Sequence, residues 1–314
     1  MNPHLAFVFP GQGSQSHGML TELAAEHTLI ESVFAEASDG AGVDLWQISR
    51  DAGDERLNQT EYTQPALLAA NIALWRLWQR QGGAQPAVLS GHSLGEYAAL
   101  VAAGALSLKD GAYLVRLRGQ YMQAAVPAGA GAMAAVLGAE DAQVEQVCVE
   151  CSRDGSTVVP ANYNSPGQIV IGGHADAVDH AIAALQAAGV RKTVKLAVSV
   201  PSHTPLMREA ALQLQDAIAA TAWNSPDRAV IHNVDATVKP DIADIQRALV
   251  EQLYLPVQWT RCTQALAAAG VRHAVECGPG KVLAGLVKRI DKSISTYNLA
   301  TPADWQACMQ QAFD

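Results

Sequence analysis

The sequence predicts an α/β protein in which a smaller unit is inserted into a larger one. Short apolar runs alternate with amphipathic segments along most of the chain, which is typical of strands that alternate with helices. Between residues 127 and 198 the order becomes strand, helix, strand, strand, helix, strand. The chain has 314 residues, more than one small core requires, so two packed units are expected.

The first 126 residues begin the larger unit. Leu5–Phe9 is predicted to be a buried strand that ends at Pro10. Pro65 is predicted to open a helix that continues to about Trp78, because proline is tolerated where the first N–H groups of a helix have no intrahelical partner. The next expected elements are a strand at Ala87–Ser90, a helix at Leu94–Ala103 and a helix from Ser107 to about Ala125.

A turn-rich joint, Pro127–Gly131, precedes the smaller unit. Its expected elements are the strand Met133–Leu137, the helix Glu140–Cys151, the strands Val158–Ala161 and Gln168–Gly172, the helix Ala175–Ala188 and the strand Arg191–Val198. This order is the split βαβ arrangement of a ferredoxin-like unit. We therefore expect an insert over residues 127–198, with the larger unit comprising residues 1–126 and 199–314 and resuming at Ser199. Its last part is expected to hold the strands Ala229–Asn233 and His273–Glu276 and a helix from Lys281 to about Asp291.

Composition and charge exclude several classes of protein. Hydrophobic residues make up 49% of the chain and charged residues 16%, whereas a disordered chain has few apolar and many charged groups. The net charge of −9 argues against binding to nucleic acid. No stretch has the length and hydrophobicity of a membrane span, and the N-terminus lacks a basic signal region. Five scattered cysteines fit free thiols, so we expect a cytoplasmic protein that does not bind membranes.

A serine lies in a pattern that suits nucleophilic catalysis. Gly91–Gly95 matches G-x-S-x-G, with a predicted strand before Ser93 and a predicted helix after it. On such a strand-to-helix turn the serine hydroxyl projects outward, and the flanking glycines let the backbone pass without a clash. A nucleophile elbow is one interpretation, and an ordinary turn built of small residues is the other.

A nucleophilic serine needs a base, and the chain contains nine histidines. His203 lies in a loop between Pro201 and Pro205, where the chain re-enters the larger unit, and the prolines stiffen that loop. His92 adjoins Ser93, but neighbouring side chains point away from each other. His203 is therefore the candidate base, although a histidine on a surface loop would give the same pattern.

Arg118 is predicted to lie on the apolar face of its helix. Its neighbours three and four residues away are Leu114, Val115, Tyr121 and Met122. A guanidinium that faces a core requires an anion, because removing its charge from water is costly. That anion is either a buried carboxylate of the protein or a carboxylate of the substrate, which an arginine beside a nucleophilic serine would select.

Motifs spread over nearly the whole chain occur together in one order. They are Phe9–Gln15, Thr63–Pro65, Gly91–Glu96, Arg118–Gly119 with Met122, Asn162–Asn164, Pro201–His203, Gln252–Tyr254 and Glu276–Lys281. The chain thereby resembles the malonyl-CoA:acyl carrier protein transacylases of type II fatty-acid synthesis. The resemblance implies an α/β-hydrolase-like large subdomain with a parallel sheet and a ferredoxin-like insert. It also implies transfer of malonyl from malonyl-CoA to the phosphopantetheine thiol of acyl carrier protein, which supplies fatty-acid elongation.

The same resemblance implies roles for individual residues. Ser93 is expected to carry the malonyl group in a ping-pong reaction, with His203 as its base. The backbone N–H of Leu94 and the loop of Gln12 are expected to form the oxyanion hole, because exposed N–H groups suit developing negative charge. The backbone carbonyl of Gln252 is expected to orient the histidine.

Substrate contacts are expected from Arg118, His92 and Met122, with the arginine gripping the malonyl carboxylate. The substrate is a coenzyme A thioester, and the partner brings the phosphopantetheine, so no cofactor is expected. No metal is expected either, because Cys148 and Cys151 form a lone C-x-x-C without a second pair.

Acyl carrier proteins are typically acidic, so an acidic chain needs a local basic patch to bind one. Two groups of basic residues are candidates: Lys281, Lys288 and Arg289 on one predicted helix, and Arg191, Lys192 and Lys195 near the end of the insert. We expect the carrier to dock between these groups, although an ordinary solvated surface would have the same composition.

Three other functions remain open on the sequence. They are an esterase or thioesterase on the same scaffold, an acyltransferase subunit of a malonate decarboxylase or a domain of a polyketide synthase, and a non-catalytic carrier-binding protein. A simple esterase has no need of a buried cation, so Arg118 disfavours the first. The combination of Ser93, His203 and Arg118 disfavours the last.

Overall fold

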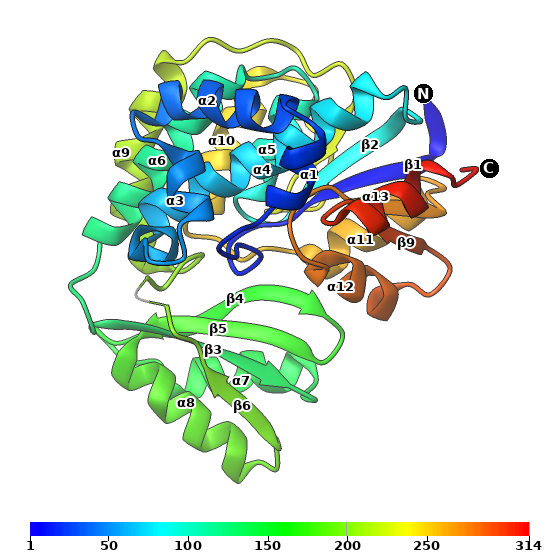
Figure 1. The fold of residues 1–314 in the computed structure, drawn as a ribbon. Helices are drawn as coiled ribbons and strands as arrows, with labels where there is room; N and C mark the ends of the chain where they lie inside the picture. The colour runs from blue at the N-terminus through cyan, green and yellow to red at the C-terminus, as the bar shows by residue number, and fades with distance from the viewer. Residues whose placement is uncertain (199, 314) are drawn as a thin grey trace.

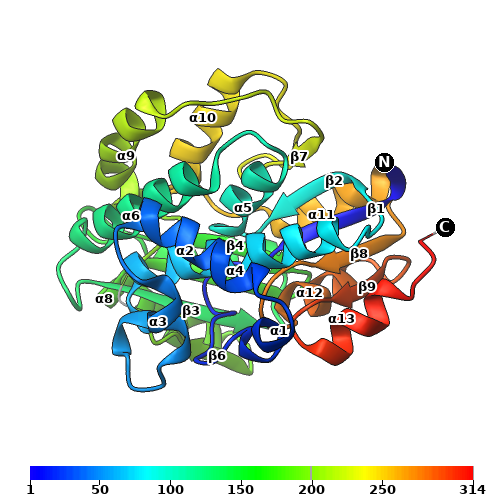
Figure 2. The same ribbon diagram turned by 45° about the horizontal axis from the view of Figure 1, so that its top comes forward.

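Two separate sheets organise the chain in a computed structural model that describes residues 1–198 and 200–313 (Figure 1). The first sheet has five parallel strands in the order β7-β2-β1-β8-β9, and Figure 2 shows β2, β1, β8 and β9 side by side. They are β1 (Asn2–Phe9), β2 (Pro86–Gly91), β7 (Ala229–Ile231), β8 (His273–Glu276) and β9 (Ser295–Asn298). The predicted α/β class with a parallel sheet is confirmed.

Helices cover both faces of this sheet, as a parallel sheet requires. The N-terminal helices are α1 (Thr21–Glu26), α2 (Leu29–Ala41), α3 (Leu45–Arg50), the 3₁₀ turn Glu55–Asn58, α4 (Thr60–Arg80), α5 (Gly95–Ala102) and α6 (Leu108–Ala124). After the insert come the 3₁₀ turn Pro205–Met207, α9 (Arg208–Ala220), α10 (Ile242–Gln252), α11 (Trp259–Ala268), α12 (Val282–Ile290) and α13 (Pro302–Met309).

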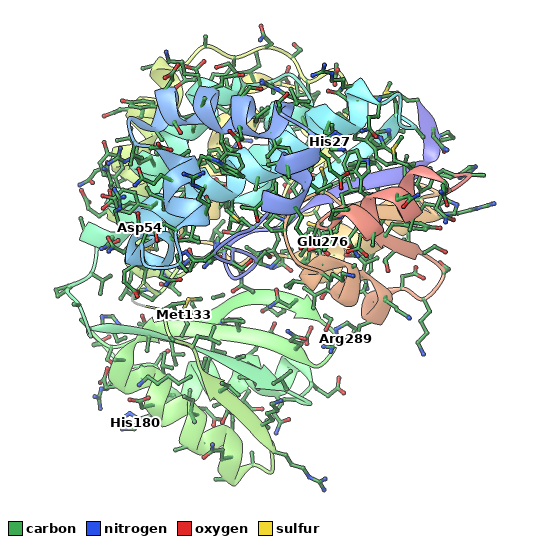
Figure 3. All side chains as sticks on the ribbon, in the orientation of Figure 1. His27, Asp54, Met133, His180, Glu276 and Arg289 are labelled. Atoms are coloured by element: carbon green, nitrogen blue, oxygen red, sulfur yellow. The ribbon has the colours of Figure 1, made fainter. Side chains whose placement is uncertain are left out.

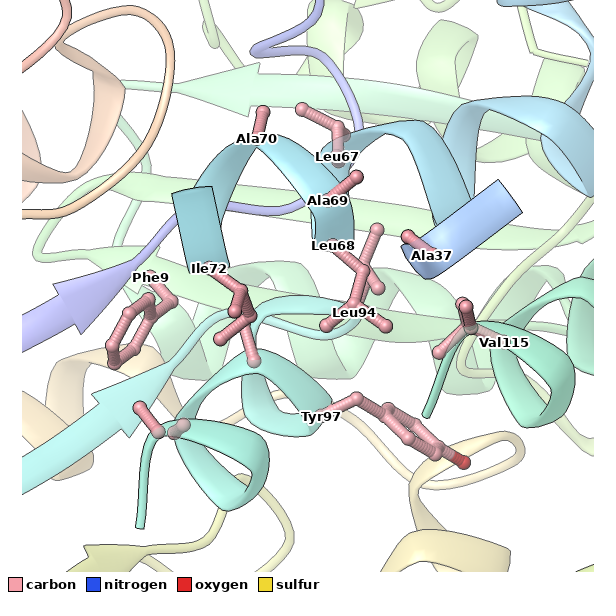
Figure 4. Packing of buried hydrophobic residues seen from close by; sticks show 14 of the residues in the cluster. Phe9, Ala37, Leu67, Leu68, Ala69, Ala70, Ile72, Leu94, Tyr97 and Val115 are labelled. Atoms are coloured by element: carbon pink, nitrogen blue, oxygen red, sulfur yellow. The ribbon is translucent and has the colours of Figure 1, made fainter. Parts of the chain in front are cut away.

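Strand β1 shows why the sheet is buried on both sides. Successive side chains of a strand point to opposite faces. Phe7 and Phe9 belong to the core that includes α4, whereas Ala6 and Val8 belong to the core beneath α11 and α12. Figure 4 shows Ile72 of α4 pointing toward the start of α5, with Phe9 beside it.

Helix α4 corrects one prediction. It begins at Thr60 and not at Pro65, which lies inside the helix. The missing N–H of Pro65 removes one intrahelical hydrogen bond. Tertiary packing supports the extra turn, because Gly119 of α6 lies against its backbone so closely that a Cβ there would be 2.5 Å from Cα of Glu61.

The second sheet is antiparallel, with strand order β4-β5-β3-β6. Its elements are β3 (Gly131–Leu137), α7 (Asp141–Cys151), β4 (Val158–Ser165), β5 (Gln168–His174), α8 (Ala175–Ala187) and β6 (Lys192–Lys195), so the predicted βαββαβ order is confirmed. Helices α7 and α8 pack on one face, which is the lower one in Figure 1. The other face carries Met133 and Val170 toward the larger unit. The expected boundary Ser199 lies outside the described residues, and the limits 127–198 remain a proposal.

The five cysteines carry free thiols. In the part of the chain that the structure describes, no helix combines the length and apolar character needed to cross a bilayer.

Candidate active site

The serine turn connects β2 to α5. Ser93 has a φ of 52°, a left-handed conformation that is rare for a residue with a side chain. The glycines on either side permit a close crossing of the backbone: a Cβ on Gly91 would lie 1.9 Å from the carbonyl carbon of Gly95, and one on Gly95 would lie 1.9 Å from the carbonyl oxygen of Phe9. The turn therefore has the strand-then-helix context and the small flanking residues of a nucleophile elbow.

His203 faces this serine. Its Nε2 lies 2.8 Å from Oγ of Ser93, and its Nδ1 lies 2.6 Å from the backbone carbonyl oxygen of Gln252. A carbonyl oxygen only accepts hydrogen bonds, so Nδ1 carries the proton and Nε2 is free to accept from the serine hydroxyl. Burial, with a smaller effect from the positive charge of Arg118, lowers the pKa of His203 to about 3. The imidazole is therefore neutral near pH 7, as a base must be.

Arg118 completes the group of reactive side chains. The residue is 2% exposed, and its Nη2 donates to Oγ of Ser93 at 3.2 Å and to Oε1 of Gln252 at 3.0 Å. Its Nη1 donates to Oε1 of Gln64 at 2.7 Å, and its Nε has no hydrogen-bond partner among the residues that the structure describes. All these acceptors are neutral, and among the described residues no Asp or Glu forms an ion pair with this guanidinium. A direct protein carboxylate, one of the two alternatives left by the sequence, is therefore not what neutralises Arg118.

A cavity of about 570 Å³ joins these groups. Its lining includes most of the predicted site: Gln12, His92, Ser93, Leu94, Arg118, Met122 and His203. The insert contributes apolar residues, among them Met133, Val170, Leu196 and Val198, and the polar residues Asn162 and Asn164, and the larger unit contributes the rest of the lining. Gln252 is fully buried behind the cavity and reaches it through its contacts with Arg118 and His203.

Two backbone N–H groups at the cavity are suited to bind an oxyanion. Those of Leu94 and Gln12 donate to no atom of the described chain, whereas the N–H of Ser93 donates to Oδ1 of Asn233 at 2.7 Å. The loop of Gln12 packs tightly on the serine turn, since a Cβ on Gly11 would lie 2.4 Å from the carbonyl oxygen of His92. Unused N–H groups near a nucleophile are the donors that stabilise a tetrahedral intermediate.

Comparisons with known proteins identify the family of the chain. Residues 6–303 match the acyl transferase domain family. The chain is 51% identical to the malonyl CoA-acyl carrier protein transacylase of Salmonella typhimurium, over 98% of this chain and 99% of that one. The chain belongs to the malonyl CoA-acyl carrier protein transacylase family.

Solved structures of family members share its fold. The crystal structure of malonyl-CoA:acyl carrier protein transacylase from Xanthomonas oryzae pv. oryzae matches with a TM-score of 0.96 and 66% identity, covering 98% of both chains. A type II polyketide acyl-carrier protein has been solved in complex with its malonyl-transacylase, which is 45% identical to this chain. The match has a TM-score of 0.95 and covers 98% of this chain and 99% of the other.

The site of this protein also contains residues for which the sequence predicts no role. Gln64 holds Arg118 and also donates through Nε2 to Oγ1 of Thr60 at 3.1 Å. The hydroxyl of Thr60 in turn donates to Oε1 of Gln12 at 3.0 Å. A chain of hydrogen bonds thus connects the arginine to the loop of the expected oxyanion hole. Gln64 lies inside the motif Thr63–Pro65, and this position was the one feature of the sequence that could have indicated a role for it in the site.

Asn164, which also lies in a quoted motif, contacts His92. Its Oδ1 is 2.8 Å from Nε2 of His92, so the imidazole lines the cavity without reaching Ser93. Burial lowers the pKa of His92, and the hydrogen bond to Asn164 partly opposes that effect.

The basic residues are only partly as predicted. Lys281 is the N-cap residue of α12, one position before the helix begins, and it pairs with Asp304 of α13 at 2.9 Å. Lys195 pairs with Asp179 at 2.6 Å. These two ion pairs reduce the positive charge available to a partner.

Lys288, Arg191 and Lys192 are also exposed, and within the described chain none of them forms an ion pair. Arg289 of α12 is also exposed and donates to Oε1 of Gln168 at 2.7 Å, and Figure 3 shows it beside the insert. Docking of a carrier at these residues stays a prediction.

Proposed function

We propose that this protein transfers a malonyl group from malonyl-CoA to the phosphopantetheine thiol of an acyl carrier protein, and so supplies fatty-acid synthesis. The observation that carries the proposal is the contact of Ser93 with two different partners. A neutral imidazole lies on one side of its hydroxyl, and on the other lies a buried arginine that pairs with no carboxylate of the described residues. This pairing suits a nucleophile that must accept an acyl group with a negative far end.

In the first half-reaction, Nε2 of His203 takes the hydroxyl proton as Oγ of Ser93 attacks the thioester carbonyl carbon. The carbonyl oxygen becomes an oxyanion, which the N–H groups of Leu94 and Gln12 stabilise by about 3–4 kcal/mol per donor, as in comparable enzymes. The carbon–sulfur bond then breaks, and the sulfur of coenzyme A leaves with the proton held by His203. A malonyl ester on Ser93 remains.

Arg118 binds the free carboxylate of the malonyl group. The cost of leaving this buried charge without an anion disfavours acetyl, which has no second carboxylate. Gln64 and Gln252 hold the guanidinium in place through neutral oxygens, so its charge remains available to the substrate. His92 and Met122 line the same cavity and bound the space for the acyl group.

In the second half-reaction, His203 takes the proton of the phosphopantetheine thiol, and the sulfur attacks the ester carbon. The bond to Oγ breaks, and Ser93 recovers its proton from the imidazole. Because coenzyme A leaves before the carrier enters, the kinetics are ping-pong. The apolar residues that the insert contributes suit the uncharged part of a phosphopantetheine arm.

Intact-protein mass spectrometry after incubation with malonyl-CoA tests the proposal. We expect one malonyl adduct that is absent from Ser93→Ala and that disappears when holo-carrier is added, with malonyl-carrier as the product. Free malonate without malonyl-carrier would instead identify a hydrolase. If the wild-type protein is folded but forms no malonyl adduct, only a carrier-binding role would remain. The cytoplasmic location expected from the sequence stays a prediction.

A further inference from the structure

Glu96 is a fully buried carboxylate that the reaction as described does not use. It lies on α5, one helical turn after Ser93, and has no exposed surface. A buried carboxylate is costly unless hydrogen-bond donors surround it. Oε1 is 2.7 Å from Nδ1 of His232, and Oε2 accepts from the backbone N–H of Asn233 at 2.9 Å and from Nε2 of Gln252 at 2.8 Å.

The contact with Gln252 determines which way its side-chain amide points. A carboxylate only accepts hydrogen bonds, so Glu96 requires the NH₂ group of Gln252 on its own side. That NH₂ group also donates to the backbone carbonyl oxygen of Ser93 at 3.0 Å. Oε1 of the amide must then point the other way, where it accepts from Arg118 at 3.0 Å. The backbone carbonyl of the same residue accepts from His203.

The contact with Asn233 fixes the serine turn. While its backbone N–H is held by Glu96, its side-chain Oδ1 accepts from the N–H of Ser93 at 2.7 Å. Its Nδ2 donates to the carbonyl oxygen of Gly91, also at 2.7 Å. Asn233 thus binds both sides of the strained turn, and the N–H of Leu94 is left free to serve the oxyanion.

Glu96 also compensates the charge of Arg118 without touching it. Both residues are buried, and the single amide of Gln252 separates them. A direct ion pair would occupy the guanidinium and compete with the malonyl carboxylate. An indirect one offsets part of the cost of the buried positive charge and leaves the guanidinium open.

We propose that Glu96 is a positioning residue for acyl transfer. It sets the orientation of the Gln252 amide, and Gln252 contacts both His203 and Arg118. It also anchors Asn233, which binds the turn of Ser93. It makes no contact with the substrate. This inference rests on the proposed function.

The variant Glu96→Gln tests this proposal. Glutamine has the same shape as glutamate, but its NH₂ group would face one of the groups that now donate to Glu96, namely His232, Asn233 or Gln252. Rapid-quench acylation with malonyl-CoA separates two outcomes. Loss of positioning lowers the rate constant, by on the order of 10²-fold, while the burst amplitude stays near one acyl group per chain. The rate with acetyl-CoA should also fall, since both substrates use the same serine and histidine, but by less, because acetyl does not use Arg118. A normal rate constant with a reduced amplitude means that Glu96 serves folding only, which would overturn the proposal.

Glu276→Gln is a matched control at another fully buried carboxylate. Glu276 ends β8 and accepts from the backbone N–H groups of Leu283 and Ala284. Its replacement should lower the melting temperature and leave the acylation rate constant unchanged. If Glu96→Gln behaves in the same way, Glu96 is no more than a structural carboxylate.

A second variant keeps the test valid if Glu96→Gln does not fold. Gln252→Met retains the backbone carbonyl that orients His203 and removes the amide between Glu96 and Arg118. We expect slower acylation at full amplitude and a reduced preference for malonyl over acetyl. A wild-type rate and preference would overturn the proposal. If the wild-type protein forms no malonyl adduct, the proposed function fails, whereas an adduct in the wild type with an unaffected Glu96→Gln contradicts only the role of Glu96.

Discussion

Ser93 and His203 face each other at 2.8 Å, and each holds a left-handed backbone conformation, with φ values of 52° and 62°. Such a conformation costs about 1–3 kcal/mol in a residue that is not glycine, so the surrounding structure must enforce it. For the serine, Asn233 and the close crossing of two glycines do so. For the histidine, the carbonyl of Gln252 holds the ring.

The low pKa of His203 predicts that catalysis persists in mild acid. Burial lowers this pKa to about 3, so the imidazole stays neutral as the pH falls through 6.5, where an ordinary histidine gains a proton. We expect kcat/KM for malonyl-CoA, measured by coupled assay, to remain level through that range. An acid limb centred near pH 6.5 would contradict the buried, neutral base.

The same pKa shift predicts a contribution to stability that depends on pH. Between about pH 6.5 and pH 3 the unfolded chain protonates this histidine and the folded chain does not. The unfolded state therefore binds more protons, and the free energy of unfolding falls as the pH is lowered through this window. Urea denaturation at several pH values should show a weaker decline for His203→Asn than for the wild type. Equal slopes would rule out the effect.

Arg118→Ala should change substrate preference. Removing one partner of a buried charge pair costs about 2–5 kcal/mol, so kcat/KM for malonyl-CoA should fall by roughly 30- to 5,000-fold. Acetyl transfer should be relatively spared. Arg116→Ala is the control, because Arg116 lies on the same helix but contacts the backbone oxygen of Ala41 and the carboxylate of Glu61. An unchanged ratio of malonyl to acetyl transfer in Arg118→Ala would remove this arginine from the site.

Gly95→Ala should destabilise the protein, because the added Cβ would lie 1.9 Å from the carbonyl oxygen of Phe9. Overpacking against backbone of this kind costs about 3 kcal/mol or more. Gly285→Ala in α12 has open space around it and should be neutral or stabilise by about 0.5–1 kcal/mol. Chemical denaturation of both variants measures the difference, and equal stabilities would show that the serine turn tolerates a side chain.

Charge reversal at Lys288 and Arg289 should weaken carrier binding. The double variant Lys288→Glu with Arg289→Glu is expected to raise KM for the carrier by on the order of tenfold at low salt and to leave acylation by malonyl-CoA unchanged. Arg80→Glu is the control, because Arg80 lies in the groove that contains His27, at the far end of the molecule from the insert (Figure 3). An unchanged KM would exclude docking at α12.

Much of the fold could be predicted because its determinants are local. The alternation of apolar runs and amphipathic helices marks strands and helices within a few residues of their observed limits, as in Leu5–Phe9 within β1. The start of α4 could not be predicted from Pro65, because the extra turn depends on contact with a glycine that lies more than fifty residues away. The ion pair of Lys281 with Asp304 could not be predicted for a related reason: it depends on how α13 packs.

By itself, the sequence determined the position of the serine turn and the apolar face of Arg118, since local spacing of residue types decides both. The residues that surround and position Ser93 and Arg118 were decided by the tertiary structure alone. Ser93, His203 and Gln252 come from separate parts of the chain, and only packing brings their atoms within hydrogen-bond distance. The same holds for Glu96, whose role depends on where an amide on α10 points. Hydrogen bonds are directional over about 3 Å, so residue identity can suggest such a network but cannot arrange it.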